Sequence, residues 1–128
     1  MAVKVLAGLE LRRYNPHMAA QVGVPELTEI RETFGLNKSD LAEVLQCSRS
    51  SITKWELRGI PRDRRASVER LVDLARIFRA RLISSRIPKI VRTPDTWLGG
   101  RTMLQTLGQE GVDPVYAYLA RFFTYNGS

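Results

Sequence analysis

The sequence predicts an all-α protein, and three observations lead to this prediction. Apolar residues recur at steps of three and four in several segments, as they do on one face of a helix. Helix-capping residues stand directly before some of these segments, as Asn37 and Ser48 do. Prolines and glycines fall mainly between the periodic segments. We expect three parts: an N-terminal segment (1–24), a helical domain (25–83) and a small helical module (84–128).

Composition narrows the classes of protein to which this chain of 128 residues can belong. Its single cysteine excludes an intramolecular disulfide framework, and its single histidine argues against a zinc site. No apolar run approaches the roughly 20 residues that span a bilayer. The short apolar run at the start is interrupted by Glu10, Arg12 and Arg13, too early for a signal peptide. We expect a cytoplasmic protein with no metal, no cofactor and no membrane partner.

The first elements can be placed from proline, glycine and periodicity. Residues 1–24 show weak periodicity, and the sequence leaves open whether they are a partly ordered segment or a dimer contact. The first helix is expected to begin at Pro25 and to end at Gly35, since proline favours a first turn and glycine a helix end. One face of this helix carries Leu27, Ile30 and Phe34.

Residues 36–56, which read LNKSDLAEVLQCSRSSITKWE, predict two short amphipathic helices joined by a tight turn. A helix with an apolar inner face and a short polar outer face can enter the major groove of DNA, so the spacing predicts a helix-turn-helix. The alternative is an ordinary helical hairpin with a solvated outer face. The apolar inner faces carry Leu41, Val44, Leu45, Ile52 and Trp55, and the polar outer face of the second helix carries Arg49, Ser50, Thr53 and Lys54.

A long helix is expected over about 64–83, after the break at residues 59–61. Its apolar positions at steps of three and four are Val68, Leu71, Val72, Ala75, Phe78 and Leu82. Residues 60–92 carry a net charge of +7, whereas residues 25–59 carry −1. Basic residues just beyond the second helix of the motif are expected to contact DNA phosphates, the alternative being a solvated helix face. They are Arg58, Arg62, Arg64 and Arg65.

The C-terminal module begins with a loop-rich stretch over residues 84–96. A short helix is expected over 101–107, stopped by Gly108, and a second from Asp113 through about 123. Nearly every side of this last helix is apolar, which favours an interface. Val115, Leu119 and Phe122 form one stripe, and Tyr116, Tyr118 and Phe123 spread aromatic surface around the rest.

Residues 27–59 resemble the Xre-type (phage-repressor-like) helix-turn-helix family, in which a segment like SRSSITKWE forms the recognition helix. Gln46 departs from the family pattern, which usually has a turn glycine there. A left-handed glutamine costs about 1 kcal/mol relative to glycine, so we expect an adjusted turn. The resemblance implies base contacts by Arg49, Ser50 and Lys54, a base or phosphate contact by Thr53, and a backbone contact by Lys38.

Residues 97–127 resemble the toxin-binding domain of the MbcA/ParS/Xre antitoxin family. Met103 departs from a proline that is common in the family, so the start of the short helix is expected to be less rigid. The pattern is carried by Leu98, Gly99, Gly100, Arg101, Thr102, Leu104, Leu107, Gly111, Val115, Leu119, Arg121 and Gly127.

This second resemblance implies that the C-terminal module neutralises a cognate toxin, typically a RES-domain enzyme that degrades NAD⁺. It also implies that the N-terminal domain binds the promoter of the same operon. In relatives the antitoxin's C-terminal end approaches the toxin's active-site entrance; the alternative here is a frayed terminus. Carried over, the toxin-binding residues are Tyr118, Arg121, Phe122, Tyr125, Asn126, Gly127 and Ser128.

The alternatives to an antitoxin that represses its own operon are a stand-alone regulator and an enzyme. A stand-alone Xre-type regulator would use its C-terminal module for dimerisation or for sensing a ligand. An enzyme is not expected, because His17 lies in a weakly structured segment, Cys47 lies inside the motif, and Gly99 and Gly100 lack the spacing of a nucleotide-binding loop. The expected partners are operator DNA and the toxin, in a homodimer or a hetero-oligomer with that toxin.

Overall fold

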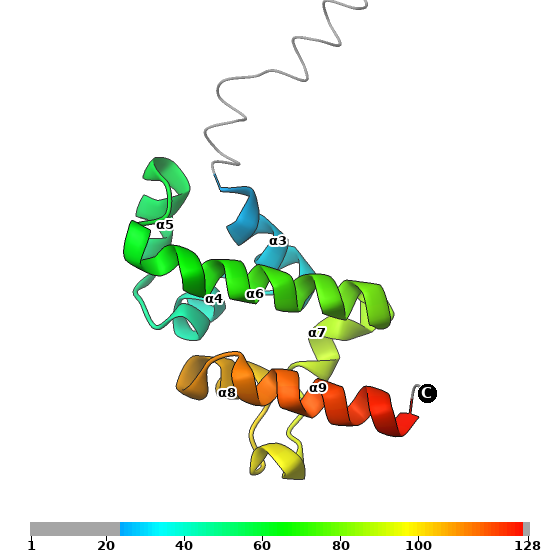
Figure 1. Ribbon diagram of the computed structural model, residues 1–128. Coiled ribbons are helices and arrows are strands. Elements are labelled where there is room, and N and C mark those ends of the chain that lie inside the picture. The colour runs from blue at the N-terminus through cyan, green and yellow to red at the C-terminus, as the bar shows by residue number, and fades with distance from the viewer. Residues whose placement is uncertain (1–23, 127–128) are drawn as a thin grey trace, which may run out of the picture.

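The computed structural model describes residues 24–126, and this part of the chain is all-α, as predicted (Figure 1). The expectations for the N-terminal segment and for Gly127 and Ser128 lie outside the described residues. The α-helices are α3 (Pro25–Phe34), α4 (Lys38–Leu45), α5 (Arg49–Arg58), α6 (Arg62–Arg81), α7 (Ile87–Ile90), α8 (Met103–Glu110) and α9 (Asp113–Asn126), and the 3-10 helices are η1 (Ser84–Arg86) and η2 (Thr96–Leu98).

Helix α3 has the predicted bounds, from Pro25 to the cap at Gly35, and α4 and α5 begin at the predicted caps Asn37 and Ser48. Gly35 ends α3 in the left-handed conformation, with φ of 69°. Asn37 starts α4 with a reciprocal capping box, since its side chain accepts from the Asp40 amide at 2.8 Å while the Asp40 carboxylate accepts from the Asn37 amide at 3.2 Å. The Ser48 hydroxyl accepts from the Ser51 amide at 3.0 Å and starts α5. The side chains of Asn37 and Ser48 each satisfy an amide that the helix itself leaves unpaired, whereas the Gly35 amide donates to the Arg31 carbonyl at the end of α3.

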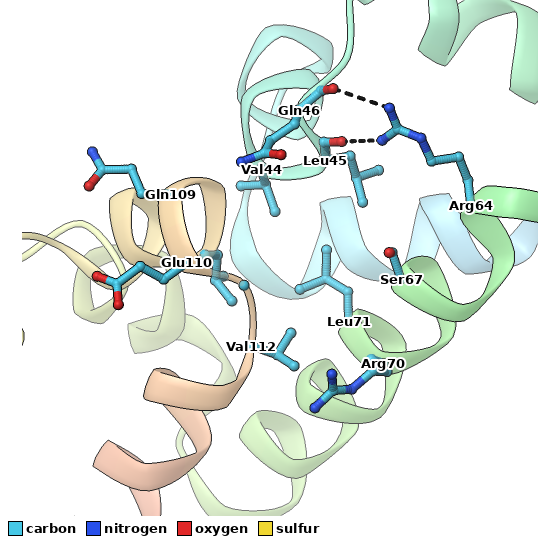
Figure 2. Close-up of a pocket in the computed structure, with 12 residues that line it drawn as sticks. Val44, Leu45, Gln46, Arg64, Ser67, Arg70, Leu71, Gln109, Glu110 and Val112 are labelled. Carbon is cyan, nitrogen blue, oxygen red and sulfur yellow. Dashed lines mark hydrogen bonds between the residues drawn. The ribbon is translucent and has the colours of Figure 1, made fainter.

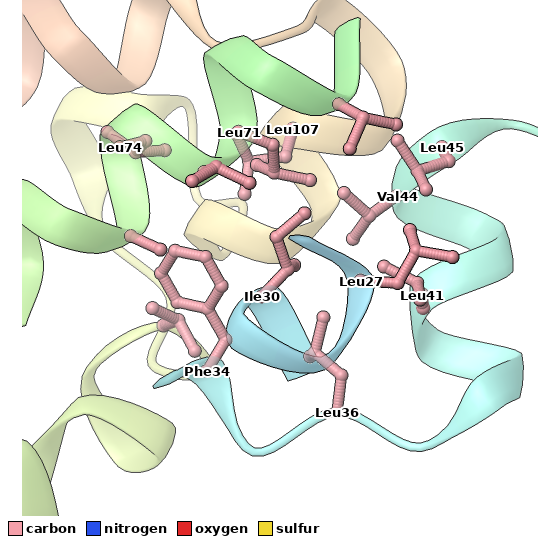
Figure 3. Packing of buried hydrophobic residues seen from close by; sticks show 14 of the residues in the cluster. Leu27, Ile30, Phe34, Leu36, Leu41, Val44, Leu45, Leu71, Leu74 and Leu107 are labelled. Atoms are coloured by element: carbon pink, nitrogen blue, oxygen red, sulfur yellow. The ribbon is translucent and has the colours of Figure 1, made fainter. Parts of the chain in front are cut away.

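The long helix α6 packs against α3 and closes the N-terminal core (Figure 3). It begins at Arg62, two residues earlier than expected. Phe34 of α3 meets Phe78 of α6 edge to face, with ring centroids 5.1 Å apart. Leu74 is fully buried although the predicted stripe omitted it. Helix α6 therefore has apolar contacts on more of its circumference than a single-faced helix.

Helix α8 packs against α4 and joins the C-terminal module to the N-terminal domain. The sequence suggested that Gly108 stops this helix, but α8 continues to Glu110. Its C-terminal cap is Gly111, where φ is 88°. A Cβ at Gly108 would lie 3.0 Å from the Glu43 carbonyl oxygen. Glycine at position 108 therefore permits a closer approach between the two helices than a residue with a side chain would.

The connection over residues 84–96 is more structured than expected, since it contains η1 and the single-turn helix α7. Ile87 and Val91 are fully buried, which anchors this connection in the core. The Arg92 guanidinium donates to the Phe34 carbonyl at 3.0 Å and to the Gly35 carbonyl at 2.6 Å. It thus satisfies acceptors at the C-terminal end of α3.

Helix α9 extends to Asn126, three residues beyond its predicted end. Val115 and Leu119 are buried as expected, whereas Phe122 is 38% exposed. The buried apolar residues of both parts form one cluster that runs from α3 through α6 to α8 and α9. In the described residues, the C-terminal module and the helix-turn-helix therefore share a continuous core.

Candidate nucleic-acid and protein interfaces

Helix α5 has the two faces that a DNA-reading helix requires. Ile52 and Trp55 point inward and are buried, with exposed fractions of 0% and 8%. The residues of its predicted outer face are all exposed. The α5 side chains available to a major groove are Arg49, Ser50, Thr53 and Lys54.

The turn before α5 keeps the left-handed conformation at Gln46, where the sequence led us to expect an adjusted turn. Gln46 has φ of 55° and ψ of 55° and ends α4. Its side-chain amide donates to the Gly108 carbonyl of α8. The glutamine therefore gains a contact that glycine could not make, which helps to offset the backbone strain.

Arg64 stabilises the same turn, while its expected phosphate contact stays a prediction. Its guanidinium donates to the Leu45 carbonyl and, at 3.3 Å, to the Gln46 carbonyl. The guanidinium carbon also lies 5.5 Å from the centre of the Trp55 ring. A cation beside the last carbonyls of α4 is favourable because these carbonyls carry the negative end of the helix dipole.

Lys38 links the start of α4 to α5. Its ammonium lies 3.2 Å from the Thr53 hydroxyl and 3.1 Å from the Glu56 carboxylate. Arg31 approaches the same carboxylate at 3.5 Å. A DNA phosphate would therefore have to compete with Glu56 for Lys38, and Thr53 shares that contact.

The predicted backbone-contacting residues Arg58 and Arg62 are exposed on either side of the break between α5 and α6. Arg65 is also exposed, and its guanidinium donates to the Ile60 carbonyl at 3.5 Å. Among residues 24–126, no salt bridge neutralises Arg49, Lys54, Arg58 or Arg62. These four cations give the α5 side of the domain a positive surface.

Residues 27–82 match a family model described as helix-turn-helix. This part of the chain is therefore similar to the helix-turn-helix family, and α4 and α5 are the two helices of that motif. The match extends from α3 through the whole of α6, beyond the residues 27–59 that carry the resemblance in the sequence. No curated protein and no solved structure matches the chain.

Several aromatic rings of the C-terminal module form a connected group that we call the aromatic ridge: Trp97, Tyr118, Phe122 and Phe123. Successive ring centroids are 5.7 Å, 6.4 Å and 5.6 Å apart. Trp97 is 43% exposed and Phe122 is 38% exposed. The Arg121 guanidinium carbon lies 5.6 Å from the Trp97 ring centre. The ridge therefore presents aromatic and cationic groups together, which is typical of protein interfaces.

Sequence reasoning assigned no site role to Trp97, although it begins the WLGGRT segment. Tyr118 is more enclosed than its prediction as a contact residue implied, since its hydroxyl donates to the Asp95 carboxylate at 2.8 Å. Burial, followed by that hydrogen bond, raises the pKa of Tyr118. Tyr125 and Asn126 are the last residues of helix α9, so this part of the predicted tail is helical backbone.

The described residues do not present a metal-binding or membrane-spanning feature. Between residues 24 and 126, no group of three or more His, Cys, Asp or Glu side chains could hold a metal ion. No helix in the same range has the length and apolarity needed to cross a bilayer. Cys47 is half-buried, and burial raises the pKa of its thiol, so this residue packs as an uncharged side chain.

Proposed function

We propose that the protein is an antitoxin that represses its own operon and neutralises a cognate toxin, a RES-domain enzyme that degrades NAD⁺. The single observation that carries the DNA-binding half is the helix-turn-helix domain with exposed Arg49 and Lys54 on α5, which form no salt bridge within residues 24–126. In this proposal α5 lies in the major groove.

The chemistry of the α5 side chains suits base and phosphate recognition. Arg49 and Lys54 can donate to the O6 and N7 acceptors of guanine, and Ser50 can donate or accept. Arg58 and Arg62 would contact phosphates on leaving the groove, which adds affinity without sequence information. Lys38 would exchange its Glu56 partner for a phosphate at the start of α4.

The toxin-binding half rests on the likeness of residues 97–127 to the antitoxin family and on the aromatic ridge. Tryptophan, tyrosine and arginine are the side chains that most often dominate binding energy at protein interfaces. Trp97, Arg121 and Phe122 would dock on the toxin, and the end of α9 would approach its active-site entrance. Helix α5 and the end of α9 lie at opposite ends of the molecule, so both partners would have access at once (Figure 1).

Co-expression with the product of the adjacent gene, followed by size-exclusion chromatography with light scattering, tests the toxin partnership. A stable hetero-complex supports the antitoxin, and its mass gives the stoichiometry. Elution of the neighbour by itself would contradict that half. Operator binding is measured separately by fluorescence anisotropy with the DNA upstream of the operon, and failure there would contradict the repressor half.

A second candidate is a stand-alone regulator whose C-terminal module senses a ligand or forms a dimer. The direct packing of α8 on α4 favours this candidate, because a conformational change in the C-terminal module would alter the position of α4 in the helix-turn-helix. This candidate predicts tight operator binding and a homodimer with no stable heterologous partner. The same chromatography separates the two functions.

A further inference from the structure

A cavity of about 370 Å³ lies between the helix-turn-helix and the C-terminal module (Figure 2). Its walls come from the end of α4, from the first half of α6 and from the turn between α8 and α9. Cavities of roughly 300–1,000 Å³ are the size that holds small organic ligands. Because it is open to solvent on one side, a ligand can enter without unfolding either part.

The cavity is apolar on its floor and cationic along one wall. Leu71, Leu107 and Val112 supply the apolar surface. Arg64 and Arg70 lie six positions apart on α6 with Ser67 between them, and the spacing of three places all three on the same face (Figure 2). The Ser67 hydroxyl points toward the cavity between the two guanidinium groups (Figure 2).

The charges around the cavity leave this wall positive. Arg64 is bonded to neutral carbonyl groups, and in the part of the chain that the structure describes no salt bridge cancels its charge. Arg70 pairs with Asp113, whose side chain is 77% exposed and therefore well solvated. The acidic residue of the opposite wall, Glu110, pairs with Arg101. An anionic group beside Ser67 would meet two guanidinium donors and one hydroxyl.

We propose that this cavity binds a small organic anion with an apolar body, and that binding controls the affinity of the helix-turn-helix for DNA. The anionic group lies at Arg64, Ser67 and Arg70, and the apolar body covers Leu107 and Val112. This site does not depend on a toxin partner. Its regulatory effect rests on the proposed operator binding.

The link to DNA binding runs through the turn before α5. Arg64 holds the Leu45 and Gln46 carbonyls, and the Gln46 side chain bonds to Gly108 of α8. A ligand anion competes with the two carbonyls for Arg64 and separates α8 from Gln46. The orientation of α5 then changes, so the ligand weakens operator binding. Couplings between two sites are commonly about 5- to 150-fold in affinity.

The binding site is tested with naphthalene-1-sulfonate, an anion with an apolar body and a permanent charge. It is titrated into the full ¹⁵N-labelled chain at constant ionic strength, with uncharged 1-naphthalenemethanol as the control probe. We expect saturable amide shifts centred on Ser67, Gly111 and Val112, with binding at least ten-fold weaker for the neutral probe. Absence of saturation, or shifts centred elsewhere, overturns the site.

Two variants separate the cavity from general surface charge. Arg70→Gln should weaken probe binding at least ten-fold, whereas Arg76→Gln, which removes the same charge from α6 outside the cavity lining, should leave it unchanged. Ser67→Phe, at an exposed position, should block the cavity while every charge remains. Equal binding by the wild type, Arg70→Gln and Ser67→Phe would overturn the assignment even if the folded spectra are identical.

The regulatory effect is measured by anisotropy on a duplex selected from a random library. Saturating probe should weaken binding at least five-fold in the wild type and leave Ser67→Phe unaffected. If the probe binds without changing the affinity for DNA, the proposed regulation is overturned, while the proposed binding site stands. A chain that selects no duplex contradicts the proposed operator binding, and the amide shifts still decide the site.

Discussion

Gly108 in α8 faces the main-chain carbonyl of Glu43 in α4, and a Cβ at position 108 would lie 3.0 Å from that oxygen. The C-terminal module and the helix-turn-helix therefore meet backbone to backbone, and a methyl group would fit there only if one helix shifted by a few tenths of an ångström. A flexible side chain could move aside at such a contact, whereas a helix carbonyl cannot move without disturbing α4.

Gly108→Ala should therefore destabilise the fold, although alanine favours helices over glycine by about 1 kcal/mol. Overpacking costs typically about 1–3 kcal/mol, so we expect a net loss near 1 kcal/mol. Urea unfolding measures it. The exposed α6 variant Ala66→Gly reports the propensity difference alone in this chain. A gain in stability for Gly108→Ala would mean that the two helices can separate at little cost.

The double substitution Arg49→Ala with Lys54→Ala should abolish sequence-specific DNA binding while leaving the fold intact, because both side chains are exposed. A good base contact contributes about 1–3 kcal/mol of discrimination. Fluorescence anisotropy with specific and scrambled duplexes measures the loss of specific affinity. Arg86→Ala with Lys89→Ala removes the same charge from an exposed segment far from α5 and should retain specific binding. Equal losses for both pairs would indicate only a net-charge effect.

Arg64→Gln should weaken DNA binding even though Arg64 does not lie on the outer face of α5. Its loss leaves the Leu45 and Gln46 carbonyls without their donor, and the turn that orients α5 loosens. We expect about 1–3 kcal/mol of lost stability, measured by thermal unfolding. Arg65→Gln is the adjacent control. It should reduce the salt dependence of DNA binding without lowering the thermal stability of the fold. If Arg64→Gln unfolds at the same temperature as the wild type, the turn keeps its conformation without the Arg64 hydrogen bonds.

Trp97→Ala should weaken the toxin complex by at least about 2 kcal/mol, the loss typical of a dominant interface residue. Calorimetry with the purified partner measures it. Leu57→Ala removes another exposed apolar side chain, 70% exposed and outside the ridge, and should leave the affinity unchanged. DNA binding by Trp97→Ala should equal that of the wild type. An unchanged complex with Trp97→Ala would remove the aromatic ridge from the toxin interface.

Tyr118→Phe should lower the free energy of unfolding by about 1–2 kcal/mol at pH 7, because the Asp95 carboxylate loses its hydroxyl donor. The pKa of Tyr118 is raised in the fold, so above the ordinary tyrosine value of 10.0 the unfolded chain releases the proton more readily. The wild type then loses stability as pH rises, and its advantage over Tyr118→Phe shrinks. Urea unfolding between pH 7 and pH 11 measures this; a constant difference contradicts it.

Local signals in the sequence were sufficient for the helix-turn-helix. Asn37, Ser48 and Gly35 act as caps through residues within a few positions, so the helix ends could be predicted. The turn at Gln46 was expected to be adjusted, whereas it keeps the left-handed conformation of a turn glycine. The predicted base-contacting residues are exposed on α5, while their contacts with DNA stay a prediction.

Errors arose where a distant segment decides the outcome. Gly108 has the local signature of a helix end, and only the approach of α4 explains a glycine inside α8. Leu74 is fully buried although it lies outside the apolar stripe that helix periodicity predicted for α6. For Arg64 the basic cluster predicted only a phosphate contact, which stays a prediction, and it did not reveal the bonds to carbonyl acceptors 18 and 19 positions away. Charge counting does not detect such neutral acceptors.

The guanidinium of Arg92 has a consequence for exchanging modules between regulators. It bonds the Phe34 and Gly35 carbonyls, at the end of a helix whose sequence lies 57 and 58 positions earlier. A fragment cut after residue 82 would retain every DNA-facing side chain and lose this donor. A chimera that joins this DNA-reading domain to an unrelated effector module therefore has to carry the linker through Arg92. The segment that has to be transferred is therefore longer than the helix-turn-helix motif itself.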